Sequence, residues 1–365
     1  MTLRLEGVAL REGRDVFLEG IDLDLDDGRL YVLLGPTLAG KTSLLRVMAG
    51  LDRPTRGRLL ADGKDVTGAS VRRRNVAMVY QQFINYPSFT VRDNIASPLR
   101  IKGMDKSEIE SRVLAAARRV QIEPLLDRLP AELSGGQQQR CAIARALVKD
   151  AGLLLLDEPL VNLDYKLREE LREELRGLFQ GGRTTVVYAT TEPHEALVMG
   201  GETILMDEGR VVQRGPTTAV FHRPNSVRAA RVFSDPPMNL VPVTVEGGVA
   251  RGAGGFALPL TGHLARLGRG NATLGVRANH LFLRPTAPDG VPFTGTVEVA
   301  EISGSETFIH LGRGGLHLVV QEEGVHERPS GAEVTVHADP ARFFAFDAQG
   351  KLAAAPGRAA LLGEA

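Results

Sequence analysis

The segment Gly35-Pro36-Thr37-Leu38-Ala39-Gly40-Lys41-Thr42 is the stretch from which the fold of this 365-residue chain can be inferred. The apolar residues 30–34 before it predict a buried strand, and residues 42–48 after it have the spacing of a helix. A glycine-rich loop in this position that ends in Lys-Thr matches G-x-x-x-x-G-K-[ST]. In such loops backbone N–H groups and the helix N-terminus attract phosphate oxygens. A chance glycine turn beside a lysine is the alternative, and both flanks argue against it.

We expect this loop to bind a nucleotide together with Mg²⁺. Lys41 would neutralise the β- and γ-phosphates, and the Thr42 hydroxyl would bind the metal ion. The residues expected to bind nucleotide here are Gly35, Pro36, Thr37, Leu38, Ala39, Gly40, Lys41, Thr42 and Ser43.

A second apolar run ends in two carboxylates. Residues 153–156 are leucines, and Asp157 and Glu158 follow them directly. A buried strand that ends in this way brings acidic side chains to the edge of a nucleotide site. We expect Asp157 to hold Mg²⁺ through water, and Glu158 to polarise the water that attacks in phosphoryl transfer. A strand that ends in a solvated acidic turn is the alternative, which the phosphate loop disfavours.

Strand and helix patterns alternate over the first part of the chain. Further buried-strand patterns occur at residues 76–80, 153–156 and 185–189, and alternation of this kind favours a mostly parallel α/β sheet. Residues 102–129 have helical periodicity without a strand pattern. They predict an inserted helical subdomain at about residues 88–150.

The pattern changes beyond about residue 235. Short β-type runs such as residues 293–299 and 307–311 are separated by Gly and Pro. They predict a second, all-β and barrel-like domain. The predicted domains are therefore residues 1–234 and 235–365.

Composition narrows the functional classes. The 44 basic and 44 acidic residues cancel, which gives no electrostatic reason to expect nucleic acid as the main partner. A single cysteine, Cys141, forbids an intrachain disulfide and is compatible with a reducing compartment. The first residues lack the apolar core of a secretory signal, and the longest apolar runs are too short to cross a bilayer. We expect any role at a membrane to depend on a partner.

Residues 133–140, Leu-Ser-Gly-Gly-Gln-Gln-Gln-Arg, resemble the signature motif of ABC-transporter ATPases. With the phosphate loop and the acidic strand end, this motif separates that family from other P-loop NTPases. Its serine and glycines start the helix predicted at residues 137–149 and form an anion-binding N-terminus. An N-cap serine with glycines for a tight turn is the alternative. The residues that the resemblance places on the γ-phosphate of ATP bound to a second chain are Ser134, Gly135, Gly136 and Gln137.

The resemblance implies further site residues. Gln81 resembles the glutamine that contacts Mg²⁺ and senses the membrane subunit, so it is a predicted catalytic and metal-binding residue beside Glu158. The segment Phe83-Ile84-Asn85-Tyr86-Pro87 would line the groove that receives a permease coupling helix. Asp164 resembles the D-loop aspartate and is expected at the nucleotide.

Residues 238–240, 275–281 and 301–307 resemble pieces of the OB-like regulatory domain, of TOBE type, in ATPases of carbohydrate importers such as the maltose type. The implied fold is an α/β P-loop NTPase domain with an inserted helical subdomain, followed by an all-β OB-like domain. The implied cofactors are ATP and Mg²⁺. The implied partners are a second ATPase chain, two membrane permease subunits and, indirectly, a solute-binding protein, at the cytoplasmic face of the inner membrane. The β domain could equally bind a ligand, a regulator or its own copy.

The chain departs from the family pattern at its own nucleotide site. The switch histidine that contacts the γ-phosphate is replaced by Thr191, the predicted catalytic residue of this segment, and His194 comes three residues later. A threonine hydroxyl can donate a hydrogen bond but cannot carry positive charge. Glu12 aligns with the aromatic residue that stacks on adenine, which leaves Phe17 as the candidate, and Val161 replaces the D-loop serine. The signature motif, which serves the partner's site, is intact, so we expect a non-equivalent pair of ATPase chains.

Residues 35–42 and 190–193 also resemble one ATPase subunit of the bacterial glycerol uptake transporter, which has two different ATPase chains. We therefore expect an ATPase subunit that couples hydrolysis to import of a polyol or sugar, with glycerol as the leading candidate. One alternative is a degenerate, mainly ATP-binding regulatory partner, against which the intact Lys41 and Glu158 argue. Another is a soluble ABC ATPase without a transport role, which would lack a permease groove and an OB-like domain.

Overall fold

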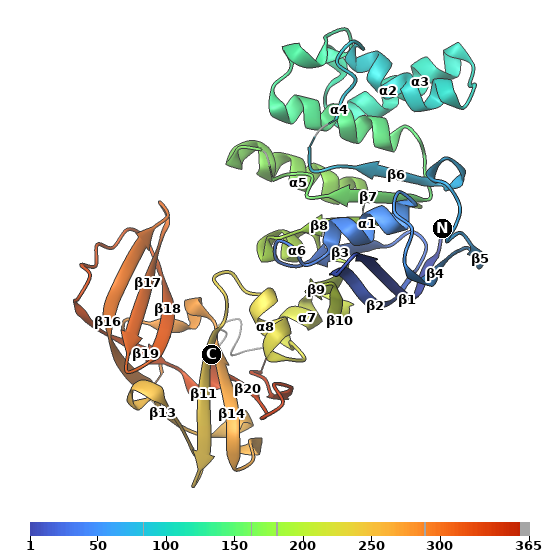
Figure 1. Ribbon diagram of the computed structural model, residues 1–365. Coiled ribbons are helices and arrows are strands. Elements are labelled where there is room, and N and C mark those ends of the chain that lie inside the picture. The colour runs from blue at the N-terminus through green and yellow to red at the C-terminus, as the bar shows by residue number, and fades with distance from the viewer. Residues whose placement is uncertain (83, 162, 180–181, 288–289, 358–365) are drawn as a thin grey trace. The chain divides into compact units, whose positions relative to one another are not determined.

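The computed structural model describes residues 1–357 except 83, 162, 180–181 and 288–289 (Figure 1). Phe83, predicted to line the permease groove, therefore lies outside the described residues. The chain forms two compact units, Met1–Thr217 and Thr218–Ala365. In the described part of the chain, no helix has the length and apolar character needed to span a membrane.

A six-stranded sheet in the order β10-β9-β3-β8-β7-β6 forms the centre of the first unit. Its neighbouring strands pair in parallel, except that β10 is antiparallel to β9. Because a parallel sheet is covered on both faces, its strands are continuously apolar, and every residue of β7 is buried. The bounds are β3 Leu30–Leu34, β6 Val76–Val79, β7 Leu153–Asp157, β8 Thr185–Thr190, β9 Glu202–Asp207 and β10 Arg210–Pro216. The predicted α/β sheet is confirmed.

An antiparallel sheet, β2-β1-β4-β5, shares a hydrophobic core with the parallel sheet and helix α1. The strand bounds are β1 Leu3–Glu12, β2 Asp15–Leu25, β4 Arg56–Ala61 and β5 Lys64–Asp65. Helix α1, Lys41–Ala49, buries its apolar side chains in this core and ends at Gly50, whose left-handed φ of 79° is a common helix terminus. The core thereby holds the start of α1 at the end of β3.

Three helices follow β6 in the chain and form the group at the top of Figure 1: α2 Val91–Ile101, α3 Lys106–Arg119 and α4 Gly135–Leu147. Helix α2 begins where the Thr90 side chain accepts the Asp93 N–H, and it buries Val91, Ile95 and Leu99 at helical spacing. In α4 the chain's one cysteine, Cys141, is buried, and burial raises the pKa of its thiol to about 11. After β7 come α5 Tyr165–Phe179 and, after β8, α6 Pro193–Met199.

The second unit contains two antiparallel sheets, in the orders β13-β12-β11-β14-β20-β21 and β15-β19-β16-β17-β18. Strand β11 alternates buried and exposed residues, as a strand with one solvated face does, and the inner faces share one core. The strand bounds are β11 Asn239–Glu246, β12 Val249–Gly252, β13 Ala257–Pro259, β14 Gly270–Val276, β15 Leu281–Phe282, β16 Val291–Ile302, β17 Glu306–Arg313, β18 Leu316–Glu323, β19 Glu333–Ala338, β20 Phe344–Phe346 and β21 Leu352–Ala354. The prediction of an all-β architecture after residue 235 is confirmed.

Short helical segments connect these elements. The α-helices are α7 Thr217–His222 and α8 Val227–Val232. The 3₁₀ turns are η1 Val71–Arg73, η2 Glu123–Leu125, η3 Pro130–Glu132, η4 Ala253–Gly255, η5 Gly262–Arg266, η6 Ala278–His280 and η7 Pro340–Arg342.

The second unit begins at Thr218, and Arg277, which directly follows β14, holds the helices before residue 235 against that strand. Its buried guanidinium donates to the carbonyl oxygens of Phe221 and Phe233 and to the Ser234 hydroxyl, at 2.7 to 3.1 Å. It also lies 3.6 Å from the centre of the Phe221 ring. Burial lowers the pKa of Arg277 to about 9. These contacts make the segment after α7 part of the second unit.

We predict that Arg277→Met leaves three buried acceptors without a donor while it retains most of the apolar packing. The opening free energy of residues 221–234 should fall by about 3 kcal/mol, because each unpaired buried acceptor is costly. Hydrogen exchange of this segment, measured in the full chain, tests the expectation. The matched control is Arg231→Met at an exposed position of α8. If hydrogen exchange of residues 221–234 in Arg277→Met were the same as in the wild type, this arginine would not be what holds the segment in place.

Candidate functional site

The loop between β3 and α1 is shaped by close backbone approaches. A Cβ on Gly35 would lie 2.3 Å from the Met206 carbonyl oxygen, and one on Gly40 would lie 2.7 Å from that of Phe17. Gly40 also has a φ of 95° as the N-cap of α1. Only glycine fits at both positions. The absence of side chains at these two positions lets the loop pack closely before the helix N-terminus, as in phosphate-binding loops.

Lys41 is the first residue of α1, directly after this loop, and only 4% of its surface is exposed. Its Nζ donates to the carbonyl oxygens of Gly35 and Pro36, at 2.8 and 3.0 Å. The same Nζ lies 3.1 Å from Oε1 of Glu158, at the end of β7. A buried ammonium group at the N-terminus of a helix fits a polyanionic ligand.

Asp157 and Thr42 face each other across the end of the sheet. The Thr42 hydroxyl donates to Asp157 Oδ1 at 3.1 Å. Burial raises the pKa of the Asp157 carboxyl, and the Thr42 hydrogen bond partly opposes this. In the described part of the chain no cluster of three or more His, Cys, Asp or Glu side chains could hold a metal. A hydroxyl and one carboxylate fit Mg²⁺, which commonly takes few protein ligands together with nucleotide phosphates.

Glu158 connects the phosphate loop to Gln81. Its Oε2 accepts a hydrogen bond from Gln81 Nε2 at 3.4 Å, while its backbone N–H donates to the Ala189 carbonyl on β8. Glu158 has a φ of 44°, an unfavourable backbone conformation for a residue with a side chain, as is common at functional sites. The structure thus brings together Lys41, Gln81 and Glu158, which are far apart in the sequence.

The signature residues form a closed N-cap on α4. Ser134 Oγ accepts the Gln137 N–H at 3.4 Å, and Gln137 Oε1 accepts the Ser134 N–H at 3.0 Å. A Cβ on Gly136 would lie 1.9 Å from a methyl group of Leu167, so glycine lets α4 approach the start of α5. Both readings of this motif, a helix cap and an anion-binding end, are compatible with this geometry.

The segment after β8 places Thr191 and His194 differently. Thr191 directly follows the last residue of β8 and is half-buried, whereas His194 is exposed in the first turn of α6. Glu195 is buried and accepts hydrogen bonds from the Thr190 and Tyr188 hydroxyls, at 2.6 and 3.2 Å. Burial raises the pKa of the Glu195 carboxyl. His194 therefore lies on the helix that follows β8.

Two further predicted residues have local roles. Asp164 Oδ1 accepts the Leu167 N–H at 3.0 Å, so this side chain caps the start of α5. Phe17, on β2, exposes 39% of its surface, and its carbonyl lies against the loop glycine Gly40. An exposed ring beside the phosphate loop fits the expectation of a stacking residue.

A groove of about 250 Å³ lies between the parallel sheet and α2 and α4. Tyr86 lines it, and the Arg145 guanidinium lies 5.3 Å from the centre of the Tyr86 ring. Other lining residues, which include Leu51, Ile101 and Lys149, were not predicted from the sequence. Ile101 is 86% exposed at the end of the otherwise amphipathic helix α2. An apolar residue outside the apolar face of a helix is the one feature of the sequence that could have indicated this part of the groove.

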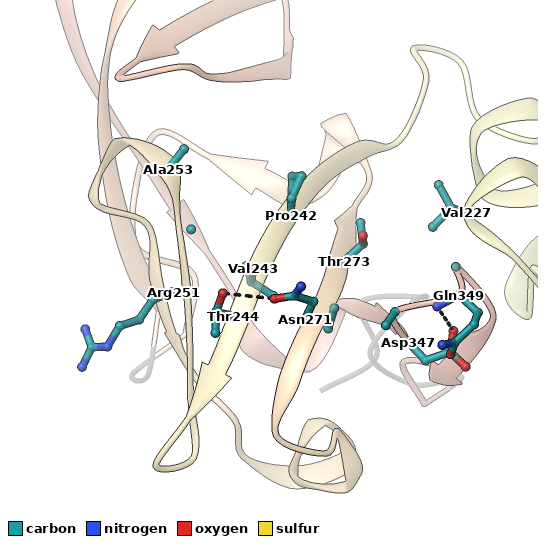
Figure 2. A pocket seen from close by; sticks show the side chains of 14 residues that line it. Val227, Pro242, Val243, Thr244, Arg251, Ala253, Asn271, Thr273, Asp347 and Gln349 are labelled. Atoms are coloured by element: carbon teal, nitrogen blue, oxygen red, sulfur yellow. Dashed lines mark hydrogen bonds between the residues drawn. The ribbon is translucent and has the colours of Figure 1, made fainter.

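A second hollow, of about 770 Å³, lies in the second unit between β11, β14 and the turn at residues 347–350 (Figure 2). Thr244 and Asn271 are hydrogen-bonded to each other on its floor, while Arg251 points away from the other labelled side chains. It contains none of the predicted site residues. The phosphate loop is therefore the candidate active site.

Comparison with known proteins agrees with this geometry. Residues 18–161 match the ABC transporter family, and residues 274–346 match the TOBE domain. An sn-glycerol-3-phosphate import ATP-binding protein of Salmonella typhimurium is 38% identical over 95% of this chain and 98% of its own. The chain belongs to the ABC transporter ATPases. The corresponding protein of Paraburkholderia xenovorans is 39% identical over 92% of this chain and 94% of its own.

Solved structures support the same family. A dimeric ATP-binding cassette in a post-hydrolysis state, bound to ADP and phosphate, is 29% identical and has a TM-score of 0.54 over 59% of this chain and 98% of its own. A subunit of the ABC transporter complex CbiONQ from Clostridium perfringens is 28% identical. Its TM-score is 0.56, over 60% of this chain and 90% of its own. The predicted fold, an ABC ATPase domain followed by a TOBE-type β domain, is confirmed, and this ABC ATPase binds ATP. The roles predicted for individual site residues stay predictions.

We predict that Lys41→Ala weakens binding of Mg·ATP by about 100-fold, because a buried charged hydrogen-bond donor to the phosphates is lost. Equilibrium binding of a fluorescent ATP analogue to the full chain measures the affinity. Lys64→Ala, at an exposed position of β5, is the matched control and should bind as the wild type does. Equal affinity of Lys41→Ala and the control would show that the loop is not the nucleotide site.

Proposed function

We propose that this ABC ATPase binds Mg·ATP at the phosphate loop and hydrolyses it with Glu158 as the group that orients and deprotonates the attacking water. The observation that carries the proposal is the contact of Glu158 with both Lys41 and Gln81. Thr42 and Asp157 would hold Mg²⁺, which when bound neutralises phosphate charge. The carboxylate of Glu158 would accept the proton of water, and Lys41 would remain on the phosphates.

The ion pair between Lys41 and Glu158 suggests an order of events. Nucleotide phosphates compete with the Glu158 carboxylate for the one buried ammonium group. Binding of ATP would therefore release the carboxylate toward water, and departure of the products would let the pair form again. On this proposal the base is available only while phosphates occupy the loop.

The subunit would act as one of two ATPase chains that face each other. The capped start of α4 offers an anion-binding helix end to the partner's nucleotide, while Thr191 stands at this chain's own switch position. An uncharged hydroxyl supports developing negative charge on the γ-phosphate less well than an imidazolium. We therefore favour a partner that is a different ATPase chain with a complete switch segment.

We predict that the chain alone hydrolyses ATP slowly and that Thr191→His raises its rate. A lost hydrogen bond to a developing charge costs on the order of 10² to 10³ in rate, so the mixed pair should far exceed the sum of the separate chains. Steady-state phosphate release measures all of these rates. His194→Ala is the control, because its exposed position predicts no change. Rapid hydrolysis by the wild-type chain alone that is lost in Thr191→Ala would overturn the degenerate-site proposal.

The groove beside α2 and α4 would receive a membrane permease subunit. Its lining is mainly apolar, with the cations Arg145 and Lys149 at one side, which suits an amphipathic helix with acidic residues. Two permease subunits, one for each ATPase chain, would hold the pair at the cytoplasmic face of the inner membrane. A solute-binding protein would act with them outside. Closure and reopening of the ATPase pair would then drive the permeases between their inward and outward states.

We infer that the solute is a small polyol, either glycerol or its phosphate ester. The relatives at 38 and 39% identity are named for import of sn-glycerol 3-phosphate, and the Thr-Thr-Glu-Pro segment at residues 190–193 resembles a glycerol-uptake subunit. A solely regulatory, ATP-binding role is the second candidate, which Thr191 favours and Glu158 disfavours. A soluble role without a permease would leave the groove unexplained.

We predict that cells without this chain lose uptake of one of these two polyols. Radiolabelled glycerol, sn-glycerol 3-phosphate and maltose should be compared in the deletion strain and after return of the wild-type gene or the Lys41→Ala variant. Only the wild type should restore the lost uptake, and maltose uptake serves as the control solute. Loss of maltose uptake alone would contradict the polyol assignment, and normal uptake of all three would contradict it as well.

A further inference from the structure

Arg168, in the first turn of α5, contacts two segments that are separate in the sequence. Its Nη1 donates to Glu192 Oε1 at 2.7 Å, and its Nη2 donates to the carbonyl oxygens of Val161 and Leu163 at 3.4 and 3.3 Å. Val161 and Leu163 belong to the turn that follows Glu158. Glu192 belongs to the segment that follows β8. One guanidinium therefore bridges the two chain segments that leave the ends of β7 and β8.

Each end of this bridge leads to a predicted catalytic residue. On the β7 side, the Val161 N–H donates to the Glu158 carbonyl, so the turn is built directly on Glu158. On the β8 side, Glu192 is the residue next to Thr191, and its N–H donates to the Thr190 hydroxyl at 3.0 Å. The Thr190 hydroxyl in turn donates to buried Glu195. The bridge thus connects Glu158 and Thr191 through short covalent paths on both sides.

The stability of helix α5 does not account for this arginine. A cation in the first turn of a helix lies at the positive end of the helix dipole, where it is unfavourable. The cap of α5 is supplied by Asp164, whose carboxylate accepts the Leu167 N–H. Arg168 turns back across the helix start to reach the carbonyls and Glu192. The planar fork of a guanidinium presents its donors on separate nitrogens in a fixed geometry, which the single ammonium nitrogen of a lysine does not reproduce.

The charge of Glu192 gives the bridge a second effect. Without Arg168, a carboxylate adjacent to Thr191 would be unpaired near the γ-phosphate that the proposed site holds. Exposed fractions of 24% for the Arg168 side chain and 38% for that of Glu192 mean that solvent weakens the pair without abolishing it. Arg168 therefore both fixes the Glu192 side chain and offsets its charge.

We propose that Arg168 is a positioning residue for ATP hydrolysis: it couples the turn after Glu158 to the switch segment at Thr191. The inference rests on the proposed roles of Glu158 and Thr191. Arg168 itself acts through these residues and not on the nucleotide.

The test is a double-mutant cycle in the full chain, with Arg168→Met, Glu192→Gln and the double variant. We expect each single change to lower kcat by about tenfold, with the KM for ATP within about twofold, and the double variant to be no slower than the slower single variant. Arg168→Lys should recover little, because one ammonium cannot replace the fork. Arg176→Met, at an exposed position later in α5, is the matched control and should leave kcat unchanged.

Hydrogen exchange gives a readout that needs no turnover. In both single variants, protection should fall together in the peptides around residues 158–164 and 189–196, while other segments and the melting temperature stay as in Arg176→Met. A kcat unaffected by Arg168→Met, multiplicative losses in the double variant, or loosening of only one of the two peptides would overturn the coupling. Failure of the proposed function is distinguished by Glu158→Gln: if that variant hydrolyses ATP at the wild-type rate, the catalytic assignment itself fails.

Discussion

The position of one ammonium group, that of Lys41, is the constraint on which the first unit depends. It is buried, so it must be compensated, and the carbonyls of Gly35 and Pro36 and the carboxylate of Glu158 all converge on it. These contacts require β3, the loop and β7 to meet at one edge of the sheet. The same meeting of elements brings other backbone atoms so close to Gly35 and Gly40 that no side chain fits at either position.

Around that edge, the chain segments that leave β7 and β8 carry Val161 and Thr191, two positions at which the sequence was predicted to depart from the family pattern. Backbone hydrogen bonds hold the two strand ends in register, so a change in one segment has a short path to the other. In the segment after β8, the carboxylates of Glu192 and Glu195 are compensated by Arg168 and by the hydroxyl groups of Thr190 and Tyr188. This network holds the segment that contains Thr191.

Short sequence patterns predicted those features of the structure that depend only on residues near one another in the chain. The glycine loop, the leucine strand that ends in Asp157 and the serine that caps α4 each depend on neighbours within a few residues, and all three lie where the sequence implied. Pairings between distant residues could not be inferred in this way. Lys41 with Glu158, Arg168 with Glu192 and Arg277 with the helices before residue 235 depend on how elements pack, and periodicity contains no information about partners.

The burial of Cys141 has a practical consequence. A thiol within α4, with its pKa raised to about 11, carries almost no thiolate at neutral pH and is shielded from reagents. We therefore expect thiol reagents to leave Cys141 in the wild-type chain unmodified, so that this chain can be used directly for site-specific labelling. Single cysteines introduced at exposed positions, for example for distance measurements by paired spin labels or fluorophores, could be modified selectively without removal of the native one.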